Sequence, residues 1–385
     1  MSRSRLAPAL ALLAGVTVAL AGCSSATSST AAAGASSGAS SAPGKDADTI
    51  GVIAVGPADD FGYNQAVAQG VAALEQALPD VKVLTAYNIP EDDTATTTME
   101  SMIDQGADII YATSYGHLDM ARTVAEEHPE VAVVHQGGVL ADGDPDNLGT
   151  YFGAVYEPVY LAGIAAGAAS KTGKLGFVYA VPIPQAMANI NAFTLGAQSV
   201  NPAASVTAVS TTSWCDPGVQ ADRVQSLLAS GADVITQHQD CTKTIIEATE
   251  AAGDYSVGYH ADASSLAPKG WLTGSQWDWT KLYVDIAKTA IAGDFVGSKY
   301  QANFRGNTAN GDNPFVSSPF GPSVTPETKA LIAAAQAKLE DGWSPFTGPI
   351  SKQDGSPLVG DGESLTQDQV ESMDYFVKGV VGSPS

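Results

Sequence analysis

From residue 50 onward, short apolar runs alternate with longer segments whose apolar residues recur at helical spacing. The pattern predicts strands at residues 50–55, 81–87, 108–112, 131–135 and 148–153, and helices at residues 64–78, 94–105 and 117–128. A repeated strand–helix–strand order is typical of parallel strands joined by right-handed crossovers. The first part of the chain is therefore predicted to form one open α/β sheet.

The same order begins again after a long helical stretch at residues 158–170. The expected strands are residues 175–179, 205–209, 234–238, 255–259 and 272–275, and the expected helices are residues 185–200, 217–230, 242–252, 277–291, 326–339 and 366–377. The chain is too long for one small core. Two successive units of similar size therefore predict two doubly wound parallel-sheet lobes.

Clusters of polar and aromatic residues directly follow the predicted strands. They are residues 59–64, 114–116, 135–137, 214–217, 238–241 and 260–262. In open parallel sheets, ligands bind beyond the carboxyl ends of the strands, where all of these clusters are expected. Turns and helix caps account for residues such as Ser114 and Asp216, but they do not account for the aromatic residues in the clusters. We therefore expect a small-molecule site where the clusters meet.

The composition argues against several classes of function. Asp and Glu outnumber Lys and Arg by 41 to 18, and the net charge of −23 disfavours binding to nucleic acid polymers or anionic lipid surfaces through charge. The sequence contains no H-E-x-x-H motif, P-loop or placed nucleophile, so we expect no catalytic residues and no enzyme activity. His135, His238 and His260 match no metal-ligand spacing and are expected to line the cleft or to make structural hydrogen bonds. We predict neither a metal site nor a cofactor.

The N-terminal segment has the pattern of a secretory signal, with two arginines before an apolar run at residues 6–21. Its end, Leu20-Ala21-Gly22-Cys23, resembles the lipobox of bacterial lipoproteins. This resemblance implies a signal peptide at residues 1–22 and a diacylated Cys23, followed to residue 48 by a flexible tether rich in Ser, Ala, Thr and Gly. We expect the protein to be anchored on the extracytoplasmic face of the cell membrane. An ordinary secreted protein and a single transmembrane anchor are the alternatives.

Taken together, the clusters resemble the basic membrane protein family, the lipoprotein substrate-binding components of ABC importers for purine nucleosides and related compounds. The resemblance rests on Asp60-Phe61-Gly62-Tyr63-Asn64, Tyr87-Asn88-Ile89-Pro90-Glu91, Pro182-Ile183-Pro184, Ser213-Trp214, Gly258-Tyr259-His260 and Trp277-Asp278-Trp279. It implies the type I periplasmic binding protein fold, with two α/β lobes joined by a hinge and a ligand cleft between them. Residues 49–153 with about 275–300 would form the first lobe, and residues 154–274 with about 301–385 the second.

The resemblance also implies that a monomeric protein captures a purine base or purine nucleoside and delivers it to an ABC permease and its ATPase. Four aromatic residues are expected to stack on the ring, namely Tyr63, Tyr115, Trp214 and Trp277. Asn64 is expected to pair with a purine edge, and Asp262 with a ring N–H or with ribose hydroxyls. Phe61 and Asp60 complete the expected site.

Two positions bear on whether the ligand is a base or a nucleoside. Nucleoside binders of the family typically carry a Lys where Trp277 stands, and a subgroup that resembles purine-base binders does not; this favours a free base. Asp262, however, matches the family residue that binds ribose hydroxyls. Two alternatives to an importer's purine receptor remain open. One is a lipoprotein that senses a ligand and signals to a membrane partner, and the other is a binding protein for a different small polar ligand.

The remaining cysteines, Cys215 and Cys241, are either a disulfide or two free thiols. An extracytoplasmic location permits a disulfide. Both residues depart from the family pattern, and both follow strands expected to be neighbours in one lobe. The resemblance therefore favours a Cys215–Cys241 disulfide at the rim of the cleft, with a stabilisation of roughly 3–4 kcal/mol.

Overall fold

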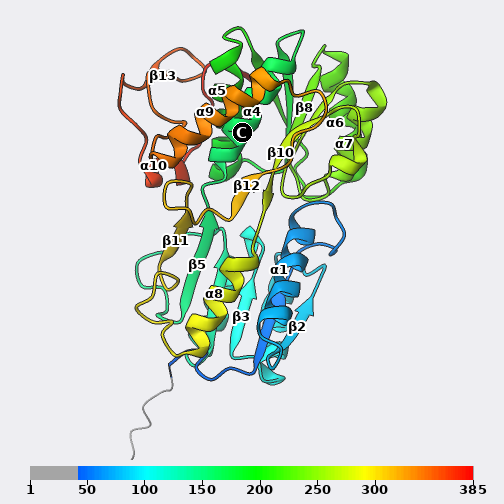
Figure 1. Cartoon of the computed structure of the whole chain (residues 1–385). Coiled ribbons are helices and arrows are strands. Elements are labelled where there is room, and N and C mark those ends of the chain that lie inside the picture. The colour runs from blue at the N-terminus through cyan, green and yellow to red at the C-terminus, as the bar shows by residue number, and fades with distance from the viewer. Residues whose placement is uncertain (1–41, 385) are drawn as a thin grey trace, which may run out of the picture. The chain divides into compact units, whose positions relative to one another are not determined.

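The computed structural model describes residues 42–384, which hold two parallel sheets (Figure 1). The predicted signal peptide, Cys23 and most of the predicted tether lie outside the described residues. The end of that tether, expected at residue 48, instead contacts the first lobe. The Gly44 amide donates to the Glu130 carbonyl at 2.9 Å, and the Asp46 amide donates to the Ile291 carbonyl at 2.9 Å. The folded part of the chain thus already includes residues 44–48.

The first lobe is built on a six-stranded sheet with the order β11-β5-β4-β3-β1-β2. Its strands are β1 (Thr49–Ile53), β2 (Lys82–Ala86), β3 (Ile109–Ala112), β4 (Ala132–Gln136), β5 (Leu148–Gly153) and β11 (Asn303–Gly306), all parallel. Its helices are α1 (Tyr63–Ala77), α2 (Asp93–Asp104), α3 (Leu118–Glu127) and α8 (Thr280–Ile291), with a 3₁₀ turn, η1, at Tyr115–His117. Strands such as β1 and β4 are apolar runs because helices cover both of their faces.

The second lobe contains a seven-stranded sheet with the order β12-β10-β9-β8-β6-β7-β15. Its strands are β6 (Lys174–Tyr179), β7 (Ser205–Ser210), β8 (Val234–His238), β9 (Tyr255–Gly258), β10 (Trp271–Trp277), β12 (Phe315–Ser317) and β15 (Val380–Val381). Its helices are α4 (Tyr156–Ala169), α5 (Pro184–Val200), α6 (Pro217–Ala229), α7 (Lys243–Ala252), α9 (Pro326–Glu340) and α10 (Gln367–Glu371), with a 3₁₀ turn, η2, at Ser264–Leu266. A small hairpin of β13 (Ile350–Ser351) and β14 (Pro357–Val359) lies outside this sheet. Only β12 runs antiparallel to its neighbour within the sheet.

The chain passes between the two sheets three times: from β5 to α4, from β10 to α8 and from β11 to β12. Glu157, in the first turn of α4, fastens two of these crossings together. Its carboxylate accepts hydrogen bonds from the Thr308 amide at 2.9 Å, the Thr308 hydroxyl at 2.6 Å and Asn313 Nδ2 at 3.0 Å. The observed architecture agrees with the predicted pair of doubly wound lobes joined by a hinge. The return to the first lobe extends through β11, slightly beyond the expected boundary near residue 300.

Two predicted helices are wrong at their ends. The helix expected from residue 277 begins at Thr280, because Trp277 completes β10: its amide donates to the His260 carbonyl and it pairs with Phe315. The helix expected over residues 366–377 ends at Glu371. Beyond it, the Asn191 side chain donates to the Tyr375 carbonyl at 2.8 Å and accepts from the Val377 amide at 2.9 Å. These backbone groups therefore make tertiary rather than helical hydrogen bonds.

Candidate functional site

A narrow cavity lies where the carboxyl ends of the two sheets face each other. Five lining residues come from the first lobe and five from the second: Tyr63, Ser114, Tyr115, Gln136 and Phe152, then Gln185, Trp214, His238, Asp240 and His260. Only about 20 Å³ between them admits the centre of a water molecule, so the walls are nearly in contact. Small-molecule sites usually span about 300–1,000 Å³. The walls must therefore move apart to admit a ligand.

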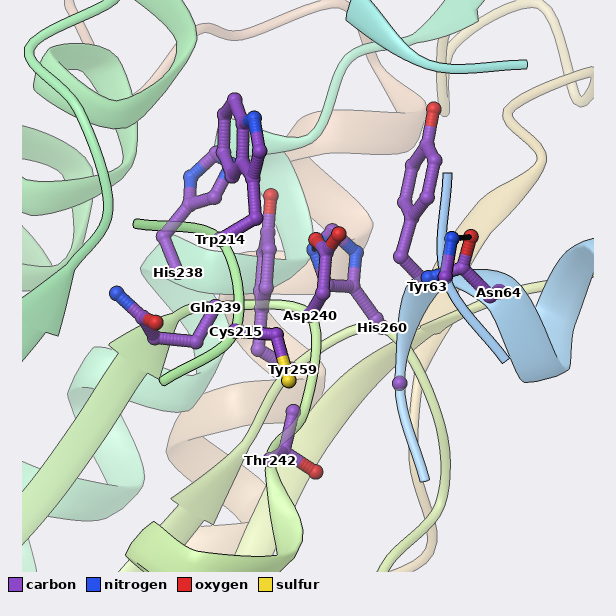
Figure 2. Close-up of polar contacts among 12 residues, drawn as sticks. Tyr63, Asn64, Trp214, Cys215, His238, Gln239, Asp240, Thr242, Tyr259 and His260 are labelled. Atoms are coloured by element: carbon purple, nitrogen blue, oxygen red, sulfur yellow. Dashed lines mark hydrogen bonds and ion pairs between the residues drawn. The ribbon is translucent and has the colours of Figure 1, made fainter. Parts of the chain in front are cut away.

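Tyr63, the first residue of α1, joins the two walls of the cavity. Its hydroxyl donates to the Thr113 carbonyl at 2.5 Å, and its ring meets the His260 ring edge-on with centroids 5.0 Å apart. Burial raises the pKa of the Tyr63 hydroxyl well above its usual value. The ring is therefore a fixed, neutral surface between the lobes, as Figure 2 shows for Tyr63 beside His260 and Asp240.

Asp60 and Asn64 build the turn that presents Tyr63. The Asp60 carboxylate accepts from the amides of Gly62, Asn64 and Gln65 at 2.8–3.0 Å and from Asn64 Nδ2 at 2.8 Å. Asn64 Oδ1 accepts from the Gly56 amide at 2.9 Å. Burial nevertheless raises the pKa of Asp60, although these hydrogen bonds oppose the shift. Both side chains are thus engaged in holding the turn that leads into α1, and neither lines the cavity.

The same turn docks directly on the second lobe. A Cβ added to Gly62 would lie 1.6 Å from the Asp240 carbonyl oxygen, so no other residue fits in this arrangement. The next contact is between the Phe61 carbonyl and the Thr242 hydroxyl, at 2.6 Å. Phe61 itself has a φ of 52°, a left-handed value uncommon outside glycine. The backbone of the turn before α1 is therefore in direct contact with the second lobe beside the cavity.

The wall of the second lobe combines one carboxyl group with two imidazoles. Burial, aided by the charges of Asp60 and Glu91, raises the pKa of Asp240 well above its usual value. Burial also lowers the pKa of His238 to about 3, and lowers that of His260 well below its usual value. His260 Nδ1 accepts from Trp277 Nε1 at 2.9 Å, which leaves the Nε2 hydrogen directed toward Asp240 Oδ1, 4.0 Å away. Both histidines are thus neutral near pH 7, and Asp240 is the acidic group of the cavity.

The aromatic lip of the cavity spans the two lobes. Trp214, after β7, donates through Nε1 to Glu91 Oε2 at 3.2 Å, while Glu91 Oε1 accepts from the Ser114 hydroxyl and the Gly116 amide at 2.7 and 2.8 Å. The Trp214 ring lies over His238, with centroids 6.2 Å apart (Figure 2). Glu91 therefore connects the first lobe to the indole of the second.

A disulfide joins Cys215 and Cys241, whose Cα atoms are 5.2 Å apart. Each cysteine directly follows a lining residue, Trp214 or Asp240, and the Asp240 amide donates to the Trp214 carbonyl at 3.0 Å. The disulfide therefore lies behind the Trp214–Asp240 wall and ties together the loops that carry it.

The family model for ABC transporter substrate-binding proteins of the PnrA-like kind, named Bmp, matches residues 47–303. The chain belongs to the Bmp family. It is 33% identical to a purine-binding protein of Brucella abortus (strain 2308), over 86% of this chain and 92% of that protein. It is also 28% identical to a Haloferax volcanii protein named as an ABC transporter glucose-binding protein, over 84% of this chain and 78% of that protein.

Among solved structures, an ABC transporter solute-binding protein from Aeropyrum pernix K1 superposes with a TM-score of 0.68. The alignment covers 84% of this chain and 95% of that chain at 15% identity, and so speaks for the fold alone. The Bmp protein has the two-lobed type I periplasmic binding protein fold. Membership of the family makes it a substrate-binding protein of an ABC transporter, with a ligand and with permease and ATPase partners.

Three of the eight expected ligand-binding residues line the cavity: Tyr63, Tyr115 and Trp214. Phe61 is half-buried outside it, and Asp262 is exposed, with its carboxylate accepting from the Ser264 amide at 2.9 Å. Trp277 lies behind His260 and stacks on Trp279, with centroids 4.2 Å apart. With Asp60 and Asn64, these five residues surround or support the cavity rather than face it.

Sequence reasoning did not assign seven lining residues to ligand contact: Ser114, Gln136, Phe152, Gln185, His238, Asp240 and His260. Five of these belong to the predicted clusters after β3, β4, β8 and β9, so the strand pattern indicated their general position. Within the described residues, no group of three or more His, Cys, Asp and Glu side chains is arranged to hold a metal ion. None of the helices in residues 42–384 has the length and apolar character needed to cross a membrane.

Proposed function

We propose that this Bmp protein captures a purine, and preferentially a free purine base, for uptake by an ABC importer. The observation that carries the proposal is a slot with rings from both lobes, Tyr115 and Phe152 on one side and Trp214 on the other. A flat ring system gains most from burial between such surfaces, and stacking on indole or phenol rings adds to the apolar contribution.

The polar groups of the slot suit the edges of a purine. Such an edge carries ring nitrogens and exocyclic groups that donate and accept hydrogen bonds. Gln136 and Gln185 are amides that both donate and accept, and Asp240 offers carboxyl oxygens from the opposite lobe. The name of the Brucella relative, a purine-binding protein, supports the same ligand class.

Two features favour the base over the nucleoside. The first is that Asp262, the residue expected to hold ribose hydroxyls, is exposed and accepts from the Ser264 amide instead. The second is Trp277, which donates from Nε1 to His260 Nδ1 and so supports the His260 ring from behind the cavity. Its bulk therefore fills space behind the cavity at the position where nucleoside binders of the family carry a Lys.

A calorimetric titration of adenine, guanine, hypoxanthine, xanthine and their nucleosides tests the ligand assignment. We expect at least one base to bind, and to bind more tightly than its nucleoside. Glucose is included because of the name of the Haloferax relative. Tight binding of glucose with no response to any purine would replace the proposal with a sugar receptor, and tighter binding of nucleosides would remove the preference for the base.

The lipobox at Cys23 supports anchoring to the extracytoplasmic face of the cell membrane. Expression of the full chain and of a Cys23→Ala variant, followed by fractionation, tests this part of the proposal. We expect the wild type in the membrane fraction, with a mass that includes the acyl chains at Cys23, and the variant without them. A wild-type protein that carries no lipid would overturn this part of the proposal.

A further inference from the structure

Gln136, the last residue of β4, is fully buried and lines the cavity. Its Oε1 accepts two hydrogen bonds, from the Tyr151 hydroxyl at 3.0 Å and from the Tyr283 hydroxyl at 2.8 Å. Tyr283 comes from α8, far along the chain, so three elements converge on this one amide. The side chain is held much more firmly than a glutamine at a protein surface.

The two tyrosines also decide which end of the amide faces them. Both rings are buried to 1% exposure or less, and each hydroxyl hydrogen needs an acceptor. Oε1 accepts from both hydroxyls, whereas a flipped amide would donate to the hydroxyl oxygens and take this acceptor away from the two hydroxyl hydrogens. The Nε2 group must therefore point away from Tyr151 and Tyr283.

Nε2 is a buried donor without a hydrogen-bond partner among the described residues. The Tyr63 hydroxyl oxygen is one group that can accept from it, because a hydrogen bond from Gln136 partly offsets the rise that burial causes in the pKa of Tyr63; the hydrogen of that hydroxyl is given to the Thr113 carbonyl. At most one of the two Nε2 hydrogens can face the Tyr63 oxygen, because they diverge from one nitrogen. A buried donor left unpaired costs about 1–3 kcal/mol, which favours a molecule in the cavity that accepts from it.

We propose that Gln136 is a specificity-determining residue, which donates through Nε2 to a hydrogen-bond acceptor of the ligand. This inference rests on the proposed function, and for a purine the acceptor is a ring nitrogen or an exocyclic carbonyl. Tyr151 and Tyr283 are positioning residues that fix the direction of the donor. The first lobe thus recognises one hydrogen-bond acceptor on the edge of the ligand. It selects against a ligand that carries an N–H or C–H group at that position.

The variant Gln136→Glu tests the inference because a carboxylate of the same size still accepts from both tyrosines but lacks the amide donor. Gln136→Met, which has no donor at any pH, is the second variant. We expect each to bind the preferred base at least tenfold more weakly at pH 8, with the far-UV circular dichroism of the wild type. The matched control is Gln105→Glu, the same change at an exposed glutamine that ends α2 and does not line the cavity.

Purine analogues give the decisive comparison. The 1-, 3-, 7- and 9-deaza analogues each replace one ring nitrogen by carbon, and unsubstituted purine lacks the exocyclic carbonyl of hypoxanthine. We expect one analogue to bind the wild type at least tenfold more weakly than its parent base, and to bind both Gln136 variants as well as the parent does. Gln105→Glu should preserve both the wild-type affinity and the wild-type difference between parent and analogue.

Two results would overturn the assignment of Gln136 while leaving purine binding intact. One is that the Gln136 variants bind the parent base and every analogue more weakly by the same factor, and the other is that the variants bind the parent base as tightly as the wild type does. If no purine binds the wild type, the proposed function fails first, and the assignment of a purine acceptor fails with it. The two failures are distinguished by the wild-type titration alone.

Discussion

At the residue scale, the cavity wall is organised by side chains that fix one another. Trp277 was expected to stack on the ligand, but its indole N–H sets the tautomer of His260. Asn189 acts in the same way on His238, donating from Nδ2 to His238 Nδ1 at 3.1 Å and to the Tyr259 hydroxyl at 2.7 Å. These hydrogen bonds fix the N–H directions of two imidazoles that burial keeps neutral.

His238 should make the stability of the protein depend on pH. Its pKa is lowered by burial from 6.5 to about 3, so the unfolded chain binds a proton more readily than the folded protein between these values. The corresponding stabilisation is complete above pH 6.5 and is lost as the pH falls toward 3. We expect the difference in melting temperature between the wild type and His238→Gln to shrink as the pH is lowered from 7 to 4. A difference that is constant over this range would contradict a neutral buried His238.

The residue scale also shows where sequence reasoning stops. It found the aromatic residues Tyr63, Tyr115 and Trp214, because bulky rings after strands are unusual in plain turns. It did not find Gln136 or Asp240, although both belong to clusters that it named. Which polar side chain of a short cluster turns inward depends on the hydrogen bonds of the loop, here to tyrosines and loops remote in sequence.

At the element scale, the alternation of strands and helices was predicted well because strands such as β1 and β3 are short buried runs and helices such as α3 and α8 are amphipathic. Elements without such a pattern were missed. The strands β11 and β15 are short and only partly buried, and they exist because β5 and β7 offer unpaired edges. The last helix was overextended because Asn191 captures the backbone at Tyr375 and Val377.

The disulfide between the loops after β7 and β8 should contribute strongly to stability. It closes a loop with a sequence separation of 26, for which chain entropy predicts about 3–4 kcal/mol. We expect the Cys215→Ser/Cys241→Ser variant to unfold at lower denaturant concentration than the wild type. A thiol reductant should lower the midpoint of the wild type toward that of the variant and leave the variant unchanged. A wild-type midpoint that does not respond to the reductant while free thiols appear would contradict this role.

At the scale of the whole molecule, contacts across the cleft favour the closed arrangement. Glu91 bonds to Trp214, the Phe61 carbonyl to Thr242, and Gln185 to the Gly137 carbonyl. A further pair, Arg305 with Glu371 at 2.5 Å, joins β11 to α10. A ligand that contacts both walls binds the closed form more tightly than the open form. This difference in affinity adds to the contacts above and shifts the population toward the closed form.

Glu91→Ala should shift that balance toward the open form. The substitution removes the bond to Trp214 and also the support that Glu91 gives to Ser114 and Gly116. A loss of about 0.5–1.5 kcal/mol from the closed state corresponds to a roughly 2- to 10-fold weaker affinity. We expect a larger radius of gyration in the ligand-free variant by small-angle X-ray scattering.

The control for this prediction is Asp104→Ala, which removes an exposed acidic residue at the end of α2, far from the cleft in sequence and structure. It should match the wild type in both affinity and scattering. Equal behaviour of Glu91→Ala and this control would show that the Glu91–Trp214 bond does not influence closure.

The way the chain enters the first lobe has a mechanical consequence. Gly44 packs against Ala132 and Ile109, at the amino ends of β4 and β3, whereas the cavity lies at the carboxyl ends of the strands. Any pull transmitted through the preceding residues therefore acts on one lobe only, at the end remote from the cleft. We therefore expect a rotation of the second lobe on its three crossings to leave the point at which the chain enters the first lobe in place.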